Sequence, residues 1–414
     1  MNSECSLVSG PCSSRRYRPR RWSATAVFLF SVLPTSTLAV DSAVAQQITD
    51  SQFMGIVTKT KITTKFEIYD PHSRQELRAV KEMGFTQVIL DWPNLHPDAT
   101  DLGLDVVLAN WWTHKTPQED IERAIELAKQ VAAGRLAGIS VMDEPQRNSP
   151  ETPFDFYVTT YNQLRSRLDR ELPGVGLEIS HWGPLASWDQ LDYHLFADLY
   201  RSADVMRIMP YPDLYEGELG DVYLMMQRSR ALMKKANRNL PLLVILQAWT
   251  LPPKSELPTI DELRVMAYQA MLGGAETVSF YHYRPEEWAA TPGFHQHFAQ
   301  LVKELKNLSR QFADATIEST LAESGILEAV LTSPSGEITT IRVNTKRTRV
   351  NDLSPLAVQR IGEQDEANSA QGGGHWRSSW ASCTIWSRNR QGIRWSRGTR
   401  RATWTEQFRR HCYR

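Results

Sequence analysis

Eight short runs of apolar and β-branched residues recur along the middle of the chain, and amphipathic stretches separate most of them. Strands that alternate with helical patterns indicate an α/β fold with a parallel sheet. Eight such strands can close a (β/α)8 barrel of roughly 250 residues. We therefore predict a (β/α)8 TIM barrel over residues 53–312, with strands at 53–58, 86–92, 104–112, 136–145, 175–182, 204–212, 242–249 and 277–283.

The connecting stretches carry helix signals. "TIDELRVMAYQAMLGG" begins at a candidate cap, Thr259, and ends in a pair of glycines, as an isolated helix between two strands should. An open, doubly wound sheet is the competing α/β architecture. Such sheets bind nucleotides through a glycine-rich turn after a strand, and the sequence has neither a G-x-G-x-x-G nor a Walker pattern. We expect no nucleotide and no other cofactor.

Residues 1–45 predict a signal peptide. The basic stretch "RRYRPRR" precedes the apolar stretch "WSATAVFLFSVLPTSTLAV", and small residues at 43–45 offer a cleavage site before Gln46. An uncleaved membrane anchor is the alternative, but the apolar run, broken by Pro34, is short of the ~20 residues that a span needs. We therefore expect an exported protein, periplasmic or extracellular, with no stable membrane insertion after cleavage.

The chain changes character after the predicted barrel. Residues 325–346 have the pattern of a β-hairpin whose turn is "SPSG", which predicts a small β-appendage at 313–352, either complete or truncated. Residues 353–414 are predicted to be a disordered tail, and their last part is rich in Arg and Trp. A basic arm that binds nucleic acid or polysaccharide is one reading of this tail, and a segment translated out of frame is the other.

Charge and cysteine content limit the chemistry of the predicted barrel. The formal net charge is zero, but the two ends are basic and the middle is therefore acidic, which argues against a nucleic-acid partner for the folded part. All four cysteines, at positions 5, 12, 383 and 412, lie outside residues 13–382. The barrel region consequently has no thiol nucleophile, cysteine metal site or disulfide.

The predicted strands end in aromatic and polar residues. In a (β/α)8 barrel the active site forms at the carboxyl ends of the strands. Sugar rings have flat C–H faces that stack on aromatic rings, whereas phosphate requires cations or backbone amides. We therefore expect an oligo- or polysaccharide substrate. The candidate binding residues are Asp91, Trp92, Asn110, Trp111, His181, Trp182, Tyr211, Gln247, Trp249, Tyr281 and Tyr283, and the candidate catalytic residues are Asp143 and Glu144.

The sequence "MDEP" at 142–145, after the fourth predicted strand, resembles the (β/α)8 glycoside hydrolases, many of which place their acid/base glutamate there in an Asn-Glu-Pro or Asp-Glu-Pro sequence. The stretch "LQAWTLPPKSELPTIDELRVMAYQAMLGGAETVSFYHY" resembles exported glycosidase-like barrels. The similarity extends over about 55–310. It implies that Glu144 is the general acid/base that protonates a glycosidic oxygen, with its pKa raised by partial burial and by Asp143.

The chain departs from that family at one position. Retaining members of the largest barrel clan place a nucleophilic glutamate at the end of strand seven, where this chain has Gln247. A second carboxylate could come from Asp91, Asp213, Glu286 or Glu287. Alternatively, the substrate could supply its own 2-acetamido nucleophile, which Asp143 would orient. A barrel that binds carbohydrate without cleaving it is the alternative function, and a metal-dependent sugar isomerase or lyase that uses His181 and His282 with Asp143 or Glu144 is the third.

Overall fold

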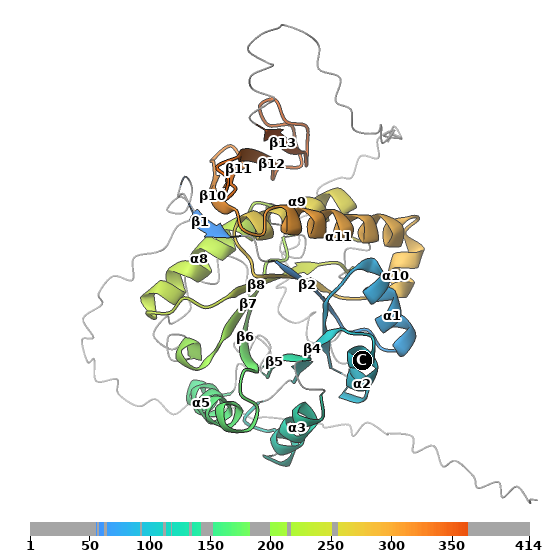
Figure 1. Cartoon of the computed structure of the whole chain (residues 1–414), viewed down its shortest axis with the longest axis vertical. Coiled ribbons are helices and arrows are strands. Elements are labelled where there is room, and N and C mark those ends of the chain that lie inside the picture. Colours follow the sequence, from blue (N-terminus) through green and yellow to red (C-terminus); the bar gives the residue numbers. More distant parts are fainter. Residues whose placement is uncertain are drawn as a thin grey trace, which may run out of the picture. The chain divides into compact units, whose positions relative to one another are not determined.

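Eight parallel strands close into a barrel, β2 to β9, in a computed structural model of the chain (Figure 1). The structure describes residue 55 and residues 58–61, 64–91, 93–110, 113–116, 118–131, 135–141, 152–182, 199–212, 217–250 and 256–362. The predicted (β/α)8 TIM barrel is confirmed. Its strands are β2 (Lys65–Tyr69), β3 (Gln87–Leu90), β4 (Asp105–Ala109), β5 (Leu136–Ser140), β6 (Gly176–Trp182), β7 (Val205–Met209), β8 (Leu242–Gln247) and β9 (Thr277–Tyr281).

The first strand of the barrel is not the one that the sequence predicts. β1 (Thr58–Lys61) pairs antiparallel with β10 (Thr316–Leu321), outside the barrel. β2 takes the predicted strand's place and pairs in parallel with both β3 and β9, which closes the ring. The prediction of a barrel strand at 53–58 was therefore wrong, and apart from Gly55 and Thr58 those residues lie outside the described part of the chain. Buried parallel strands are usually apolar throughout. β2 was not recognised in the sequence because it contains the charged residues Lys65 and Glu67.

Helices surround the strands, as Figure 1 shows. Helix α1 begins after Ser73, whose side chain accepts a hydrogen bond from the N–H of Glu76 at 3.2 Å. The predicted cap Thr259 is confirmed and forms a capping box with Glu262. None of the described helices is long and apolar enough to span a membrane. The helices are α1 (Arg74–Met83), η2 (Pro93–Leu95), α2 (His96–Asp101), α3 (Gln118–Gln130), α5 (Phe154–Glu171), α8 (Asp221–Lys235), α9 (Ile260–Leu272), α10 (Pro285–Ala290) and α11 (Phe294–Gln311).

An antiparallel sheet in the order β1-β10-β11-β12-β13 follows the barrel. The predicted hairpin is confirmed as β11 (Ile326–Thr332) and β12 (Ile338–Asn344). The hydroxyl of Tyr223 on α8 donates to the carbonyl of Ser319 at 2.9 Å and thereby ties the sheet to a barrel helix. β13 (Val358–Gly362) lies within the segment predicted to be a tail. β13 has only a weak apolar pattern, and it is a strand because it pairs with β12. The sheet therefore extends to Gly362, and residues 363–414 lie outside the described part of the chain.

A buried group of charged side chains occupies the barrel interior. The guanidinium of Arg207 on β7 donates to both carboxylate oxygens of Glu67 on β2, at 2.8 and 3.2 Å, and its Nε–H donates to Glu178 on β6. All three side chains are at most 4% exposed. Burial opposes the charge on Arg207, but Glu178 and Glu67 hold its pKa well above its ordinary value. We call these three residues the barrel triad.

Room for the barrel triad depends on a glycine of the neighbouring strand. A Cβ atom added to Gly138 on β5 would lie 2.5 Å from a carboxylate oxygen of Glu178 and 3.1 Å from the carbonyl oxygen of Gly176. The first distance is shorter than real Cβ contacts, and the second is tighter than most of them and involves backbone, which cannot move easily. Glycine at position 138 therefore lets the Glu178 side chain lie inside the barrel and reach Arg207.

Replacing the cation of the barrel triad should destabilise the fold most at neutral and alkaline pH. In Arg207→Met, two carboxylates remain buried without their cation, and loss of one partner of a buried pair costs ~3–5 kcal/mol. Burial already raises the pKa of Glu178, and without Arg207 the folded chain should bind a proton there more tightly than the unfolded chain does. Stability then falls as the pH rises through that pKa. Urea unfolding at pH 5 and pH 7.5 should show the larger deficit at pH 7.5.

The exposed pair of Arg135 with Asp105, 3.1 Å apart, provides the control for this prediction. Arg135→Met should change the free energy of unfolding by less than ~1 kcal/mol at either pH, because exposed ion pairs contribute little. Equal stability of Arg207→Met and the unmodified protein at pH 7.5 would contradict the stabilising role of the cation.

Candidate functional site

The carboxyl ends of all eight strands lie at the same end of the closed parallel barrel, which we call the mouth. β5 is the fourth strand of the barrel and β8 is the seventh. These are the positions that the sequence predicted for the strand before "MDEP" and for the strand that carries Gln247. Asp143 and Glu144 come after β5 and lie outside the described residues, as do Trp92 and Trp111. His181 and Trp182 end β6, but their side chains are not among those described.

Aromatic rings from four neighbouring strands meet at the mouth. The centroid of the Tyr281 ring, at the end of β9, lies 5.2 Å from Tyr69, 5.6 Å from Trp249 and 6.4 Å from Tyr211. These residues end or follow β2, β8 and β7. Tyr69 and Tyr211 also belong to a buried apolar cluster that includes Ile245. We call Tyr69, Tyr211, Trp249 and Tyr281 the mouth cluster, and the predicted candidates Tyr211, Trp249 and Tyr281 are thus brought together.

Two polar atoms beside the mouth cluster have no hydrogen-bond partner among the described residues. Gln247 ends β8, is 3% exposed, and donates from its amide nitrogen to the carbonyl of Trp249 at 3.2 Å. Its Oε1 atom is buried and unpaired, and so is the indole Nε1 of Trp249. An acceptor and a donor are therefore left unsatisfied within three residues of one strand end, where an unpaired buried polar group costs ~1–3 kcal/mol. A ligand hydroxyl can both donate and accept.

His282 lies next to the mouth cluster and is held neutral. Its ring stacks on Tyr281 with centroids 4.3 Å apart and lies 5.7 Å from Trp249. The guanidinium Nε–H of Arg284 donates to Nε2 of His282. Burial, together with the charges of Arg284 and His72, lowers the pKa of His282 from 6.5 to about 3. The ring nitrogen that accepts from Arg284 is not available to a metal ion in this arrangement.

Other predicted candidates lie outside the mouth cluster. Tyr283 is 5% exposed and packs its ring against Trp288 of α10 at 5.0 Å, where burial raises its pKa. Asp91 follows β3 and is exposed, and Asn110 follows β4, with its N–H donating to the carbonyl of Ser140 at 2.7 Å. Glu287, considered as a second carboxylate, accepts from the N–H and the hydroxyl of Thr250, both at 3.0 Å.

The end of β2 contributes residues that the sequence interpretation missed. Tyr69 belongs to the mouth cluster, and Asp70 and His72 follow it with 2.8 Å between the Oδ2 and Nε2 atoms. They were overlooked because the first strand was placed at 53–58. The signal was present in "KFEIY", whose charged and aromatic positions alternate with two apolar ones, as in a strand with a polar inner face.

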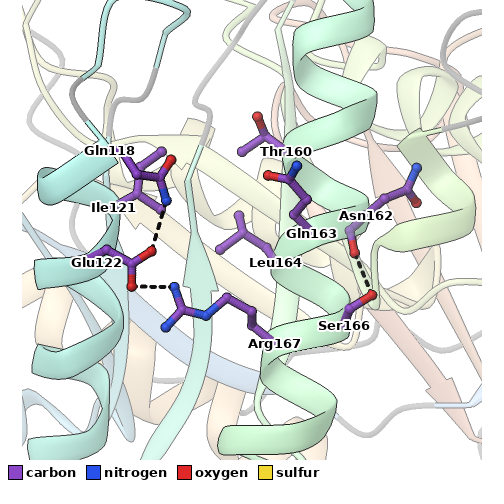
Figure 2. Close-up of a pocket in the computed structure, with 9 residues that line it drawn as sticks. All are labelled: Gln118, Ile121, Glu122, Thr160, Asn162, Gln163, Leu164, Ser166 and Arg167. Atoms are coloured by element: carbon purple, nitrogen blue, oxygen red, sulfur yellow. Dashed lines mark hydrogen bonds and ion pairs between the residues drawn. The ribbon is translucent and has the colours of Figure 1, made fainter.

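A hollow lies on the outside of the barrel, between α3 and α5. It has a volume of about 440 Å³, and Figure 2 shows its lining residues. Glu122 accepts from Gln118 at 2.8 Å and from Arg167 at 2.6 Å. The charged groups of this hollow are thus paired with each other, in contrast to the unpaired atoms at the mouth.

No cluster of three or more His, Cys, Asp or Glu side chains that could hold a metal ion occurs in the described part of the chain. The metal-dependent alternative combined His282 with His181 and an acidic residue at 143 or 144. Of this group only the His282 side chain is described, and it is hydrogen-bonded to Arg284.

The barrel is similar in fold to solved glycoside hydrolases. A glucosidase from Croceicoccus marinus matches 71% of this chain and 76% of its own at 11% identity, with a TM-score of 0.49. An arabinofuranosidase from Xanthomonas axonopodis pv. citri matches 71% and 86% at 11% identity, with a TM-score of 0.46. An endo-beta-1,4-mannanase from Thermotoga petrophila matches 74% and 92% at 10% identity, with a TM-score of 0.39. Similarity at this level concerns the fold alone and identifies no substrate. A scan of protein-family models and a search of curated proteins find no match.

The low pKa of His282 should be visible in the pH dependence of stability. The unfolded chain takes up a proton at this residue near pH 6.5, whereas the folded chain does so only near pH 3. Stability is therefore lost as the pH falls from about 6.5. His282→Gln, which keeps an acceptor for Arg284, should reduce this loss between pH 7 and pH 4.5 when urea unfolding is followed by circular dichroism. His297→Gln, an exposed position on α11, is the control, and identical pH profiles for His282→Gln and the unmodified protein would refute the assignment.

Proposed function

We propose that the protein is an exported glycoside hydrolase that binds an oligo- or polysaccharide across the mouth cluster and uses Glu144 as its general acid/base. The observation that carries this proposal is the combination of four aromatic rings in edge-on or tilted contact with the unpaired Oε1 of Gln247 and Nε1 of Trp249. The aromatic faces suit the C–H faces of a sugar ring, and the unpaired atoms suit its hydroxyls. The Asp-Glu-Pro sequence after the fourth strand supports Glu144 as the acid, and the basic and apolar N-terminal sequence supports export.

Gln247 determines which hydrolytic mechanism fits. It ends the seventh strand of the barrel, and an amide cannot form the covalent glycosyl ester of a two-carboxylate retaining mechanism. In the substrate-assisted reaction that we favour, Glu144 protonates the glycosidic oxygen while the bond from that oxygen to the anomeric carbon breaks. The acetamido oxygen of the substrate forms a bond to the anomeric carbon, with Asp143 orienting the acetamido N–H. Water then opens the ring so formed and gives its proton to Glu144.

A carbohydrate-binding protein without hydrolytic activity is the second candidate function. Gln247 favours it, because the end of the seventh strand carries an amide where many barrel hydrolases need a carboxylate. Such a protein would use the mouth cluster in the same way. It would differ only in releasing the sugar unchanged.

The variant Glu144→Gln tests the acid role. Hydrolysis of alkyl glycosides, neutral and 2-acetamido, should fall ~10²–10⁴-fold, because general acid–base groups contribute about that much. The loss on 4-nitrophenyl glycosides should be smaller, because 4-nitrophenolate leaves with little protonation. Binding of the matching S-linked thioglycosides, measured by calorimetry, should persist because the mouth cluster is unchanged. Glu126→Gln, on the exposed face of α3, is the control. If the unmodified protein binds thioglycosides but releases no nitrophenol from any glycoside, the binding-protein alternative is correct.

The variant Asp143→Asn tests the substrate-assisted mechanism. It should slow the hydrolysis of 2-acetamido glycosides strongly, since the orienting charge is lost, and a thiazoline analogue of the bound intermediate should inhibit the unmodified protein. In a two-carboxylate mechanism, Asp143→Asn would shift the acidic limb of the pH–rate profile and thiazolines would have no effect. Equal rates on plain and 2-acetamido glycosides, with both rates abolished by Asp91→Asn or Glu286→Gln, would exclude substrate assistance.

A further inference from the structure

Asp70 occupies an unusual backbone position at the mouth. It follows the last residue of β2 and has a φ of 62°, in the left-handed region that few residues other than glycine adopt. Its N–H donates to the carbonyl of Ile89 on β3 at 3.0 Å, and the carbonyl of Tyr69 accepts from the N–H of Tyr283 at 3.0 Å. The backbone at Asp70 is therefore held between the neighbouring strands of the barrel. Backbone conformations of this kind cluster at functional sites.

The Asp70 carboxylate is only half satisfied. Its Oδ2 atom pairs with Nε2 of His72 at 2.8 Å, and the N–H of His72 donates to Glu76 on α1 at 2.7 Å, which fastens this loop to the helix. The other oxygen, Oδ1, is buried and has no hydrogen-bond partner in the part of the chain that the structure describes. A buried carboxylate oxygen without a donor is costly. A ligand that supplies a donor would remove that cost.

The neighbours of Asp70 indicate what kind of donor fits. Tyr69, the preceding residue, lies in the mouth cluster against Tyr281. The unpaired atoms of Gln247 and Trp249 belong to β8, which is separated from β2 by β9 alone. Three buried polar atoms that lack partners among the described residues thus come from one arc of the mouth, around the aromatic rings. A carboxylate accepts hydrogen bonds and repels anions, so the donor should be a hydroxyl of a sugar without phosphate, sulfate or carboxylate at that position.

We propose that Asp70 is a sugar-binding residue that accepts a hydrogen bond from one hydroxyl of the carbohydrate in the mouth, with His72 as the positioning residue that fixes its carboxylate. The inference rests on the sugar-binding part of the proposed function and is independent of hydrolysis. It adds a recognition contact that fixes the orientation of the sugar on the mouth cluster.

Binding of S-linked aryl thioglycosides, which a glycosidase does not cleave readily, tests this role by calorimetry. Asp70→Asn and Asp70→Gly both tolerate a left-handed backbone but remove the charged acceptor. Each should weaken binding of the best-bound thioglycoside about 10- to 100-fold, as expected for loss of a hydrogen bond to a charged group. The melting temperature should stay the same or rise, because the unpaired buried oxygen is no longer a charge. Asp101→Asn, an exposed residue of α2 that lies near Arg74, should leave binding unchanged.

Monodeoxy analogues of that thioglycoside identify the contact. Removing the hydroxyl that donates to Asp70 should weaken binding to the unmodified protein about tenfold or more, and should make little difference to Asp70→Gly, which has no side-chain acceptor. A structural role would give the opposite pattern, with a lowered melting temperature and unchanged affinity, and would overturn the proposal. Failure of the unmodified protein to bind any thioglycoside would overturn it as well. Binding that depends on Asp70, without release of nitrophenol from the O-glycosides, would refute the proposed hydrolysis and uphold this inference.

Discussion

The paired charges of the barrel triad connect the core of the molecule to its mouth. Arg207, Glu67 and Glu178 come from three strands and must face inward together, which fixes the facing of every residue on those strands, since side chains alternate. Two residues after Glu67 the chain reaches Tyr69, whose hydroxyl lies 3.4 Å from Nη1 of Arg207. The same alternation places Arg207, Met209 and Tyr211 on one face along β7 and the residues that follow it. The mouth cluster is thus built in register on the charged layer beneath it.

The barrel triad and the mouth differ in how their buried polar groups are paired. In the barrel triad each carboxylate has a cation, and Gln87 donates a further hydrogen bond to Glu67. At the mouth, Asp70, Gln247 and Trp249 each keep one buried polar atom without a partner among the described residues. Such atoms reduce stability when nothing binds. Buried polar atoms without partners also occur elsewhere in the described residues, for example Ser180 Oγ on β6 and Ser279 Oγ on β9. Those of Asp70, Gln247 and Trp249 differ because they lie at strand ends that also carry the aromatic rings of the mouth cluster. This combination is the basis of the proposed ligand binding at the mouth.

The sequence predicted the barrel because seven of its strands are apolar runs that overlap the observed ones, from 86–92 to 277–283. The sequence did not predict β2, because Lys65 and Glu67 are residue types that usually lie on the surface. Only the structure shows that Glu67 is buried against Arg207. That error also hid Asp70 and His72. The positions of Gln247, Trp249 and Tyr281 at strand ends were predictable because these residues end or follow clearly apolar strands. The packing of Tyr283 against Trp288 depends on α10 and has no local signal. β13 was missed because pairing with β12, rather than its own composition, makes it a strand.

The strand order shows which strands face each other across the mouth. The mouth cluster and the unpaired atoms come from β7, β8, β9 and β2, which are consecutive around the ring. In a ring of eight strands, the fourth lies opposite the eighth, so the end of β5 is opposite the end of β9. A sugar bound against the arc of aromatic rings would therefore present its far edge to the side from which the Asp-Glu-Pro segment departs. In the proposed reaction, the residues that bind the sugar and the strand that precedes Glu144 in the sequence thus come from opposite sides of the ring of strands.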